Sequence, residues 1–455
     1  MDFTDKNILV VGLARSGLAA AKLLKGLGAN VIANDIKNKN QLGEVYKELD
    51  LIGVEWALEV RPDEYLDRAD LVVISPGISI ESPFVKKAIK MGIEVISEVE
   101  LAYRLCKAPI VAITGTNGKT TTTALVGEIF KAVPRETYIV GNIGIPFASI
   151  ASQTQESQVV VAEVSSFQLE AMPTFHPRVA TVLNITPDHL DRHKTMDNYI
   201  NLKGGIFKNS TPSDWVILNA DDPLSASLAQ RTKAQVFFFS RTKKLSKGAW
   251  VEADWVVLDV GQGRETVCRT DDIFIPGPHN LENALAAALI TRVMGVSPKT
   301  IAEVLKDFRG IEHRIELVDT VDGITFYNDS KGTNIDAAKK AIESMNGPTV
   351  LIAGGYDKGG SFEPLIDACG EVVNHIVVLG QTSDKIIKAA KDKGFQHVYK
   401  VDSLEEGVKK AFSLALPGGN VLLSPACASW DMFKDFEERG RVFKEAVRVL
   451  KEEKR

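Results

Sequence analysis

Apolar runs alternate with helical stretches through the first hundred residues. Residues 7–11 (NILVV) are apolar, and the glycine-containing turn GLARSG and a helical stretch at 18–27 follow them. Further strands are expected at 30–34, which ends at Asp35, and at 71–74. Short apolar strands separated by helices are typical of a parallel sheet, because parallel strands need crossover connections.

A second series of strands and helices begins at residue 109. The run PIVAIT (109–114) predicts a buried strand, and the segment GTNGKTTT and a helical stretch to residue 132 follow it. Short β-type runs fill 235–275. The remaining elements that we expect here are strands at 158–164 and 179–185 and helices at 281–294 and 298–308.

A third series follows residues 308–310. Residues 315–321 and 324–328 flank Asp322-Gly323 and predict a β-hairpin. Four more strands are expected at 349–353, 375–379, 397–401 and 420–423, and an amphipathic helix at 433–450. The pattern as a whole predicts an α/β protein with three domains, at 1–101, 102–309 and 310–455.

Composition and charge narrow the class of protein. Of the 455 residues, 45% are hydrophobic and 25% are charged, which excludes disorder as the main state. The 54 basic and 59 acidic residues give a net charge of −5 without a block of one sign. We therefore expect neither a nucleic-acid partner nor a membrane partner.

Cysteine usage and the N-terminal sequence indicate a cellular compartment. The four cysteines are far apart and form no CxxC pair, which argues against a structural zinc site or a disulfide framework. The N-terminus lacks a basic segment, and no apolar run approaches the ~20 residues of a membrane helix. We expect a reducing, cytoplasmic location.

The loop ITGTNGKT at residues 113–120 is the strongest chemical signal. Glycines let backbone N–H groups turn toward a phosphate, and the N-terminus of the following helix adds a positive pole. Lys119 can neutralise phosphate charge, and the hydroxyl of Thr120 can bind Mg²⁺. The loop is a variant P-loop, because Ile113 stands where the first glycine would be. An ordinary glycine turn is the alternative.

Three further residues fall where a nucleotide site needs them. Glu163 ends the apolar run QVVVAE, at the edge of a sheet where ligands bind in open α/β folds. His189 lies in NITPDHLDRH, just past the next strand, and Lys203 follows fourteen residues later on a predicted helix. Taken singly, each has an ordinary explanation: a solvated strand end, a structural histidine and a surface lysine.

The first glycine-containing turn suggests a dinucleotide site. The segment GLARSG resembles GxGxxG, with Ala14 at the middle glycine, and Asp35 lies eighteen residues beyond Gly17. This spacing suits a carboxylate that binds a ribose, as in NAD enzymes. The motif is degenerate, however, and a P-loop a hundred residues later does not belong to a simple dehydrogenase.

Eight ordered motifs together carry a family resemblance: GTNGKTTT, EVSSFQLE, NITPDHLDRH, PGPHNLENALAA, IEHRIE, NDSKGTN, GGYDKGG and LLSPACASWDMF. Over essentially its whole length the chain resembles the Mur ligases, the ATP-dependent amide-bond ligases of bacterial peptidoglycan assembly. Within the family it is most similar to the members that attach D-glutamate to a UDP-linked muramoyl-alanine. The resemblance implies that ATP phosphorylates the alanine carboxylate and that the amine of D-glutamate attacks the acyl phosphate.

The resemblance also implies a role for each domain and for the catalytic residues. The first domain would be a Rossmann-like fold that binds the UDP-substrate, the central P-loop domain would bind ATP, and the Rossmann-like C-terminal domain would bind the amino acid. Two Mg²⁺ ions are implied. Thr120 and Glu163 would hold one, and His189 and a carbamylated Lys203 would hold the other. A carbamate is needed because an ammonium cannot ligate Mg²⁺, which prefers oxygen. Lys119 would hold the transferred phosphate.

The binding residues that the resemblance implies fall into three sets. ATP would contact Gly115, Thr116, Asn117, Gly118, Lys119, Thr120, Thr121, Asn280, Asn283, Arg314, Asp329 and Lys331. The UDP-substrate would contact Leu13, Ala14, Asp35, Ile36, Lys37, Gly77, Asn142, Ser165 and His189. D-Glutamate would contact Lys331, Thr333, Lys358, Ser429, Trp430 and Phe436.

Some of these assignments have simpler explanations. Asn280 and Asn283 have amide groups that can read adenine, but Asn280 is also well placed to cap a helix that starts at Leu281. For Trp430 and Phe436 the simpler interpretation is that they belong to the core of the last domain, and without the resemblance we would favour it for Phe436. We expect a monomer that acts on small-molecule substrates.

Other activities remain as alternatives. Folylpolyglutamate synthases belong to the same superfamily but lack a domain before the P-loop. The alanine-adding Mur ligase tends to carry His where this loop has Asn117, and the ligase that adds diaminopimelate or lysine usually shows a DNPR motif, which this chain lacks. A dinucleotide-dependent oxidoreductase or sensor is the alternative from a different class.

Overall fold

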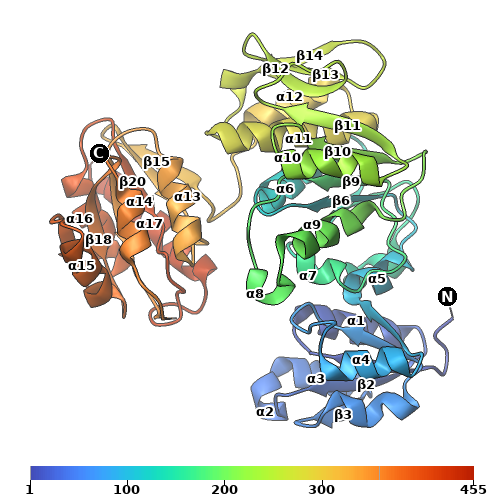
Figure 1. Ribbon diagram of the computed structural model, residues 1–455. Coiled ribbons are helices and arrows are strands. Elements are labelled where there is room, and N and C mark those ends of the chain that lie inside the picture. Colours follow the sequence, from blue (N-terminus) through green and yellow to red (C-terminus); the bar gives the residue numbers. More distant parts are fainter. Residues whose placement is uncertain (1, 358, 455) are drawn as a thin grey trace. The chain divides into compact units, whose positions relative to one another are not determined.

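The computed structural model describes residues 2–357 and 359–454, except the side chains of Asp191 and Asp336. The chain forms two compact units, drawn in Figure 1. The first comprises Met1–Phe274 and Pro278–Phe308, and the second comprises Ile275–Gly277 and Arg309–Arg455. In the described part, no helix combines the length and the apolar character that a membrane crossing requires. The α/β class that the sequence predicts is confirmed by three separate sheets.

The first unit begins with a five-stranded parallel sheet in the order β3-β2-β1-β4-β5. Its strands are β1 (Asn7–Val11), β2 (Asn30–Asp35), β3 (Glu55–Leu58), β4 (Leu71–Ile74) and β5 (Glu94–Ser97). Its helices are α1 (Arg15–Gly26), α2 (Lys39–Leu42), α3 (Glu44–Leu51), η1 (Pro62–Arg68), α4 (Pro83–Lys90) and α5 (Glu98–Tyr103).

A nine-stranded sheet in the order β14-β13-β12-β11-β10-β9-β6-β8-β7 completes the first unit. It is parallel from β7 to β12, and β13 and β14 extend it in antiparallel fashion. The strands are β6 (Ile110–Thr114), β7 (Thr137–Gly141), β8 (Val159–Glu163), β9 (Val179–Val182), β10 (Trp215–Asn219), β11 (Gln235–Ser240), β12 (Gly248–Glu252), β13 (Trp255–Asp259) and β14 (Glu265–Arg269). The helices are α6 (Lys119–Lys131), η2 (Phe147–Ser149), η3 (Ala151–Gln153), α7 (Ser166–Leu169), α8 (Leu190–His193), α9 (Met196–Gly204), η4 (Gly205–Phe207), α10 (Pro223–Ser227), η5 (Leu228–Arg231), η6 (Thr270–Asp272), α11 (Pro278–Val293) and α12 (Pro298–Asp307).

The second unit contains a six-stranded sheet in the order β15-β16-β20-β17-β18-β19, in which only β15 is antiparallel to its neighbour. The strands are β15 (Glu316–Val321), β16 (Ile324–Asn328), β17 (Thr349–Ala353), β18 (Val373–Val378), β19 (Val398–Lys400) and β20 (Asn420–Leu423). The helices are α13 (Ile335–Glu343), α14 (Glu363–Cys369), α15 (Ser383–Asp392), α16 (Leu404–Leu414) and α17 (Phe436–Glu453). The predicted hairpin is thus β15 and β16.

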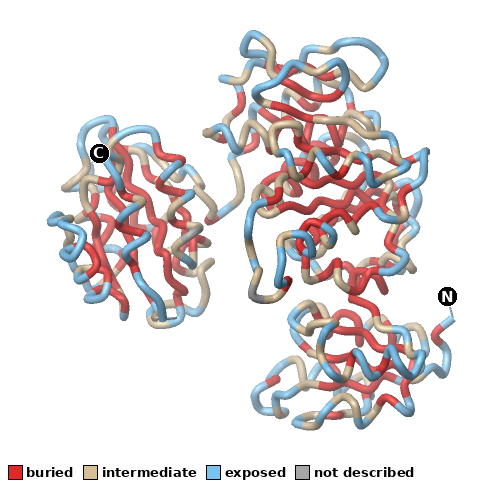
Figure 2. The backbone as a smooth tube through the Cα atoms, viewed as in Figure 1, coloured by how far each residue is buried: buried red, intermediate tan, exposed pale blue. Residues whose placement is uncertain are grey.

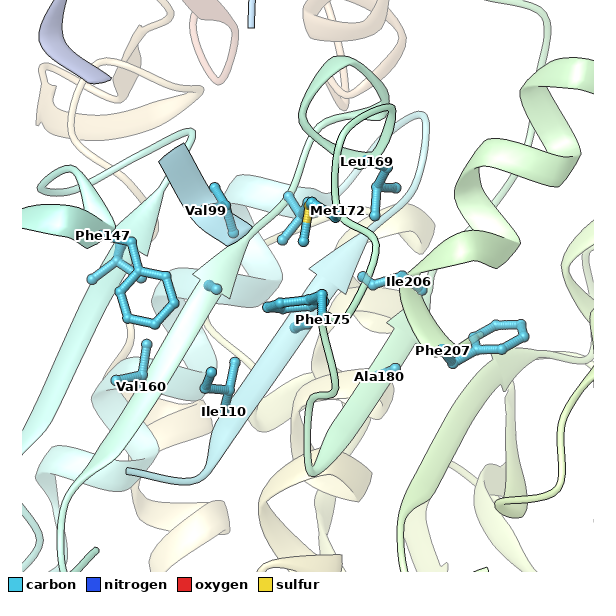
Figure 3. Packing of buried hydrophobic residues seen from close by; sticks show 14 of the residues in the cluster. Val99, Ile110, Phe147, Val160, Leu169, Met172, Phe175, Ala180, Ile206 and Phe207 are labelled. Carbon is cyan, nitrogen blue, oxygen red and sulfur yellow. The ribbon is translucent and has the colours of Figure 1, made fainter. Parts of the chain in front are cut away.

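The buried strands explain why the sheets form where they do. Figure 2 shows the strands as the main buried segments. Strands β6, β8 and β9 are buried at every position, as expected for parallel strands covered by helices on both faces. One hydrophobic cluster joins Val99 of α5 to Phe147 and Phe175 of the central part, and Figure 3 shows these side chains packed over the central strands. Helices α1 and α5 of the first sheet therefore pack against the core of the P-loop sheet, whereas the strands of the first sheet form hydrophobic clusters of their own.

The helices of the second unit cover its sheet on two faces. Helices α13, α14 and α15 pack in one hydrophobic cluster, and α16 and α17 pack in another on different strand residues. The connections after β16 and β17 therefore leave toward one face, whereas the connection after β20, which lies between them, leaves toward the other. Ligands in open α/β sheets bind at such points, beyond the carboxyl ends of the strands.

A substitution at Gly440 tests the packing of α17. A methyl group at this helical position would lie 2.1 Å from Nδ1 of the buried His313. We expect Gly440→Ala to lower the free energy of unfolding by about 1–3 kcal/mol, the usual cost of overpacking. Chemical denaturation measures this change. Gly26→Ala on α1, where a methyl group meets nothing within 4 Å, is the control and should be neutral or stabilising. Equal denaturation midpoints for the two variants would contradict the close packing of Gly440 on His313.

Candidate active site

The P-loop connects β6 to α6. Gly118 forms the N-cap of α6 with a left-handed φ of 80°, which turns the chain into the helix. The ammonium of Lys119 donates to the carbonyls of Gly115 and Thr116, at 2.8 Å each. The lysine therefore already lies over the loop that would surround a phosphate. Thr120 and Thr121 are buried in the first turn of α6.

A segment after β9 holds the P-loop in shape. The carboxamide of Asn184 accepts from the backbone N–H of Asn117 (2.8 Å) and donates to its carbonyl (3.2 Å). The hydroxyl of Thr116 donates to the carbonyl of Thr186 at 3.1 Å. Asn184 was not among the residues that the sequence predicted. Its position directly after an apolar strand, in the segment NIT, is the signal that could have identified it.

Glu163 lies beside the P-loop, as β8 pairs with β6 and places Glu163 opposite Ile113. One carboxylate oxygen, Oε1, accepts from Nδ2 of Asn142 at 2.8 Å. The other, Oε2, is buried and has no hydrogen-bond partner. A buried carboxylate oxygen without a partner destabilises the folded chain unless a cation or a hydrogen-bond donor binds to it. Glu163, at the end of β8, and Thr120, in the first turn of α6, carry oxygen donors of the kind that Mg²⁺ prefers, so these residues fit the ion.

Lys203 is buried on α9, next to the same loop. It is 1% exposed, and its Nζ donates to the carbonyl of Gly115 at 2.8 Å. The Lys119 ammonium donates to this same carbonyl. Burial, followed by repulsion from Lys119, holds the pKa of Lys203 well below its ordinary value. Lys203 is therefore not the surface lysine that its spacing alone suggested. It also lies 4.6 Å from the ring centre of Tyr199.

His189 lies on the turn between β9 and α9. It is the N-cap of α8 and has a left-handed backbone with φ of 52°. The imidazole is half-exposed and lies 4.8 Å from the ring of Phe167 on α7. Among the described residues, no group of three or more His, Cys, Asp and Glu side chains is placed to bind a metal ion. The carboxylate of Asp188 lies 3.6 Å from Nε2 of His189, so a second cation here would need a further donor beyond these two side chains.

The two asparagines of the HNLEN segment contact each other on α11. Asn283 is buried; its Oδ1 accepts from the hydroxyl of Thr122 on α6 (3.2 Å), and its Nδ2 donates to Asn280 (3.2 Å). The expectation that Asn280 caps a helix from Leu281 is wrong. The helix begins at Pro278, so Asn280 lies inside its first turn. Proline is favoured at the first helical position because its missing N–H costs nothing there.

Asp35 shapes the first glycine-containing turn. Its carboxylate accepts from the backbone N–H of Leu13 (2.7 Å) and of Lys37 (3.0 Å). Gly17 lies so close to the chain that a methyl group there would be 1.9 Å from the carbonyl of Gly12, as the third glycine of GxGxxG requires. The neighbouring Ile36 is 87% exposed. The hydroxyl of Ser75, another residue that the sequence did not single out, donates to the Gly12 carbonyl at 2.6 Å.

The remaining predicted substrate contacts of the first unit lie on four connections that follow strands of the two sheets. Ala14 is the N-cap of α1, without a side-chain cap. Ser165 caps α7 in a capping box with Gln168, so its hydroxyl already has a structural partner. Gly77 follows β4, and Asn142 follows β7.

Asp329 is the central carboxylate of the second unit. It follows β16 and is 4% exposed, and its oxygens accept from the hydroxyl of Ser424 (2.6 Å) and the N–H of Ile315 (3.3 Å). Burial raises the pKa of Asp329 to about 7, although the Ser424 hydrogen bond and the charge of Arg314 oppose the rise. The charge of Arg314 therefore acts on the Asp329 carboxylate, and the roles of both residues toward the nucleotide stay predictions.

Arg439 is a buried residue that the sequence did not identify. From α17 it donates to the carbonyl of Ser330 (2.8 Å) and to the carbonyls of Cys427 (3.1 Å) and Ala428 (3.3 Å). Burial lowers its pKa to about 10. The guanidinium thus fixes the connections that follow β16 and β20. The predicted ligands Lys331, Thr333 and Ser429 lie on these two connections.

The two aromatic candidates differ in exposure. Trp430 is 64% exposed and lies 5.6 Å from the ring of Tyr356, so the core interpretation of Trp430 is wrong. Phe436 is half-buried and lies 6.2 Å from the ring of His313, with the ammonium of Lys331 5.9 Å from its centre. Phe436 is absent from the two hydrophobic clusters of the second unit. Lys358 lies outside the described residues.

Comparison with known proteins matches the whole chain. The MurD-like N-terminal domain of Mur ligases matches residues 6–97, the Mur ligase middle domain matches 113–291, and the Mur ligase glutamate ligase domain matches 313–427. A UDP-N-acetylmuramoylalanine–D-glutamate ligase from Caldanaerobacter subterraneus is 51% identical over 99% of this chain and 100% of its own length. The ligase of the same name from Clostridioides difficile is 46% identical over the same shares.

Solved structures agree with the fold. The UDP-N-acetylmuramate–alanine ligase MurC from Thermotoga maritima has a TM-score of 0.60 and 20% identity, over 98% of this chain and 100% of its own. The MurF ligase from Thermotoga maritima in complex with ADP has a TM-score of 0.57 and 16% identity, over 92% and 96%. At these identities the likeness concerns the fold alone. The full-length relatives at about half identity decide the family, and the chain belongs to the Mur ligases.

Proposed function

We propose that this chain is an ATP-dependent ligase that joins D-glutamate to UDP-N-acetylmuramoyl-L-alanine, as a monomer in the cytoplasm. The observation that carries the proposal is the buried, unpartnered oxygen of Glu163 beside a P-loop. The Mg²⁺ ion that accompanies a bound nucleoside triphosphate would give this oxygen a partner. The relatives that share half of the sequence over the full length are named as D-glutamate ligases, which supports this choice of amino acid.

The reaction begins with phosphoryl transfer between two anions. The substrate carboxylate attacks the γ-phosphorus of ATP, the bond to the β-phosphate oxygen breaks, and ADP leaves. Such a transfer mainly needs charge neutralisation and alignment. Lys119 neutralises the transferred phosphate, and the loop N–H groups orient it. Thr120 and Glu163 hold Mg²⁺, which when bound neutralises further phosphate charge.

Amide formation completes the reaction. The amine of D-glutamate attacks the carbonyl carbon of the acyl phosphate, the carbon–oxygen bond to phosphate breaks, and inorganic phosphate leaves. The α-ammonium of D-glutamate must first lose a proton to become the nucleophilic amine, and the attacking nitrogen loses a second proton, to the departing phosphate or to water, as the amide forms. The described residues that would hold D-glutamate are Lys331, Thr333, Ser429, Trp430 and Phe436. The other predicted contact, Lys358, lies outside the described residues. Arg314 and Asp329 would face the nucleotide, as would Asn280 and Asn283 through their amides.

We also propose that Lys203 carries a carbamate. Its burial and its position beside Lys119 favour the neutral amine, which is the form that reacts with CO₂. The carbamate would supply a further oxygen donor for a second Mg²⁺ held by His189. Two ammonium groups at the Gly115 carbonyl would repel each other. An anionic carbamate on Lys203 would instead attract the Lys119 ammonium.

The first sheet is the proposed site of the UDP group. The proposed contacts near the glycine-containing turn are Leu13, Ala14, Asp35, Ile36 and Lys37. The other proposed contacts lie on connections that follow later strands of the first unit: Gly77, Asn142, Ser165 and His189. A thermal-shift panel tests this part of the proposal. UDP-N-acetylmuramoyl-L-alanine and ATP with Mg²⁺ should each raise the melting temperature, and NAD(H) and NADP(H) should not. A shift with NAD(H) and none with the UDP-substrate would contradict the proposal.

Asp35→Ala should selectively weaken the binding of the UDP-substrate. The variant loses the acceptor for the N–H groups of Leu13 and Lys37, so the turn is no longer held in shape. Hydrogen bonds to a charged group contribute about 1.5–3 kcal/mol, so we expect the Kd for the UDP-substrate to rise at least tenfold. Isothermal titration calorimetry measures it, and the Kd for ATP should not change. Asp67→Ala, at an exposed position on η1, is the control. A weaker affinity for ATP alone would contradict this assignment.

A further inference from the structure

Arg192 on α8 makes contacts on two sides of its guanidinium. On one side, Nε and Nη2 donate to the two carboxylate oxygens of Glu170, at 3.0 and 2.6 Å. On the other, Nη1 donates to the carbonyl of Gly77 (3.1 Å) and Nη2 donates to the carbonyl of Ile78 (2.9 Å). The central carbon of the guanidinium, Cζ, lies 4.7 Å from the centre of the Phe167 ring. The side chain is only 15% exposed, so these contacts are shielded from water.

The contacts of Arg192 join segments that are far apart in the sequence. Gly77 and Ile78 follow β4 in the first sheet, whereas Phe167 and Glu170 follow β8 in the P-loop sheet. A cavity of about 980 Å³ lies beside the guanidinium, between the segment after β4 and the segments of the P-loop sheet. The cavity is lined by Ser79 and Ser82 on one side and by Asn198 and Asn201 on the other. Arg192 therefore bridges the two sheets where they are not packed directly on each other.

The turn that carries Arg192 is also tied to the P-loop. The ring of His193, the next residue, lies 5.4 Å from those of Phe167 and Tyr199. The hydroxyl of Tyr199 lies 3.2 Å from that of Thr116 in the P-loop. A continuous set of contacts thus runs from the Gly77 carbonyl, through Arg192 and His193, to the loop expected to hold ATP.

We propose that Arg192 is a positioning residue that sets the register between the UDP-substrate site and the phosphate-transfer site. His189 lies three residues before it on the same turn, and Gly77 belongs to the expected substrate site. By fixing the Gly77 connection to this turn, Arg192 holds the far end of the substrate, its alanine carboxylate, at the P-loop. This inference rests on the proposed function of the first unit.

The geometry requires an arginine rather than any cation. A planar guanidinium can donate to a carboxylate on one edge and to two carbonyls on the other, whereas an ammonium has neither this fork nor the flat face above Phe167. If Arg192 only supplied positive charge for an anionic substrate, Arg192→Lys would retain most of the activity. The positioning role predicts that lysine does not substitute.

The experiment compares Arg192→Lys, Arg192→Ala and a control arginine. Arg178 is the control because it also pairs with a carboxylate (Asp214, 3.2 Å) and lies over an aromatic ring (Trp215, 4.4 Å). It precedes β9, at the opposite end of the strands from the P-loop. The affinity for UDP-N-acetylmuramoyl-L-alanine is measured by calorimetry, and KM and kcat are measured by phosphate release.

We expect kcat/KM for the UDP-substrate to fall about 10²-fold in both Arg192 variants, as for a misplacement of about 1 Å. Substrate affinity should fall with it, KM for ATP should stay unchanged, and Arg178→Ala should behave as the wild type. Should Arg192→Ala fail to fold, Arg192→Lys and Glu170→Gln carry the same test. If folded Arg192→Lys retains the wild-type affinity and kcat/KM, or if KM for ATP rises in parallel, the positioning role is wrong. Failure of the wild type itself to release phosphate would instead contradict the proposed function, and the calorimetric comparison would still report on Arg192.

Discussion

Lys119→Ala should abolish phosphate release and leave UDP-substrate binding nearly intact. Its ammonium lies over the P-loop, at 2.8 Å from two loop carbonyls, where the transferred phosphate would lie. Removing a charge that stabilises a transferring phosphate costs on the order of 10³-fold or more in rate. The UDP-substrate is expected on the first sheet, so its affinity should not depend on this side chain.

Single-turnover phosphate release and calorimetry measure the two quantities for Lys119→Ala. Lys131→Ala is a matched control, because this lysine is exposed at the last turn of the same helix and pairs with Glu128 one turn earlier. Activity of Lys119→Ala within tenfold of that of Lys131→Ala would remove Lys119 from the mechanism.

Lys203→Arg should be almost inactive, although it keeps a positive charge. If Lys203 acts as a carbamate, arginine cannot form one, and the oxygen donor for the second cation is lost. If Lys203 instead pairs directly with a phosphate, arginine should retain part of the activity. The burial of Lys203 against Lys119 favours the carbamate, because two neighbouring ammonium groups repel each other in a site of low polarity.

A rescue experiment separates a lost ligand from a damaged fold. Short carboxylic acids added to Lys203→Ala should restore part of the turnover only if an anionic oxygen is missing. Lys208→Arg, at an exposed position shortly after α9, is the control and should be as active as the wild type. Turnover of Lys203→Arg within tenfold of the wild type, or a bare ammonium in an active crystal with ATP bound, would contradict the carbamate.

Strands buried on both faces were the easiest elements to predict. Runs such as those of β1, β6 and β17 are mainly apolar and are followed by glycine-containing turns, so both the strand and its end are visible in the sequence. The sequence analysis did not identify β3, β5, β7 and β10. Strands β3 and β5 have only four residues and each begins with a glutamate, and a single short apolar run such as β10 has no period that separates a strand from a helix.

Residues of the candidate site were predictable where their chemistry follows from a local motif. Lys119 and Thr120 belong to a loop whose function depends on consecutive residues. Asn184 and Arg439, in contrast, act on backbone atoms of segments distant in sequence, and only the folded chain brings donor and acceptor together. The roles of the predicted ligands stay predictions until ligands are bound.

The identity of the amino acid is the most direct test of the proposed function. Purified protein with Mg²⁺, ATP and UDP-N-acetylmuramoyl-L-alanine is supplied with D-glutamate or L-glutamate, and phosphate release and the mass of the UDP product are measured together. We predict one phosphate per new amide with D-glutamate and negligible product with L-glutamate. No release with either enantiomer, or release only with another amino acid, would contradict the proposal.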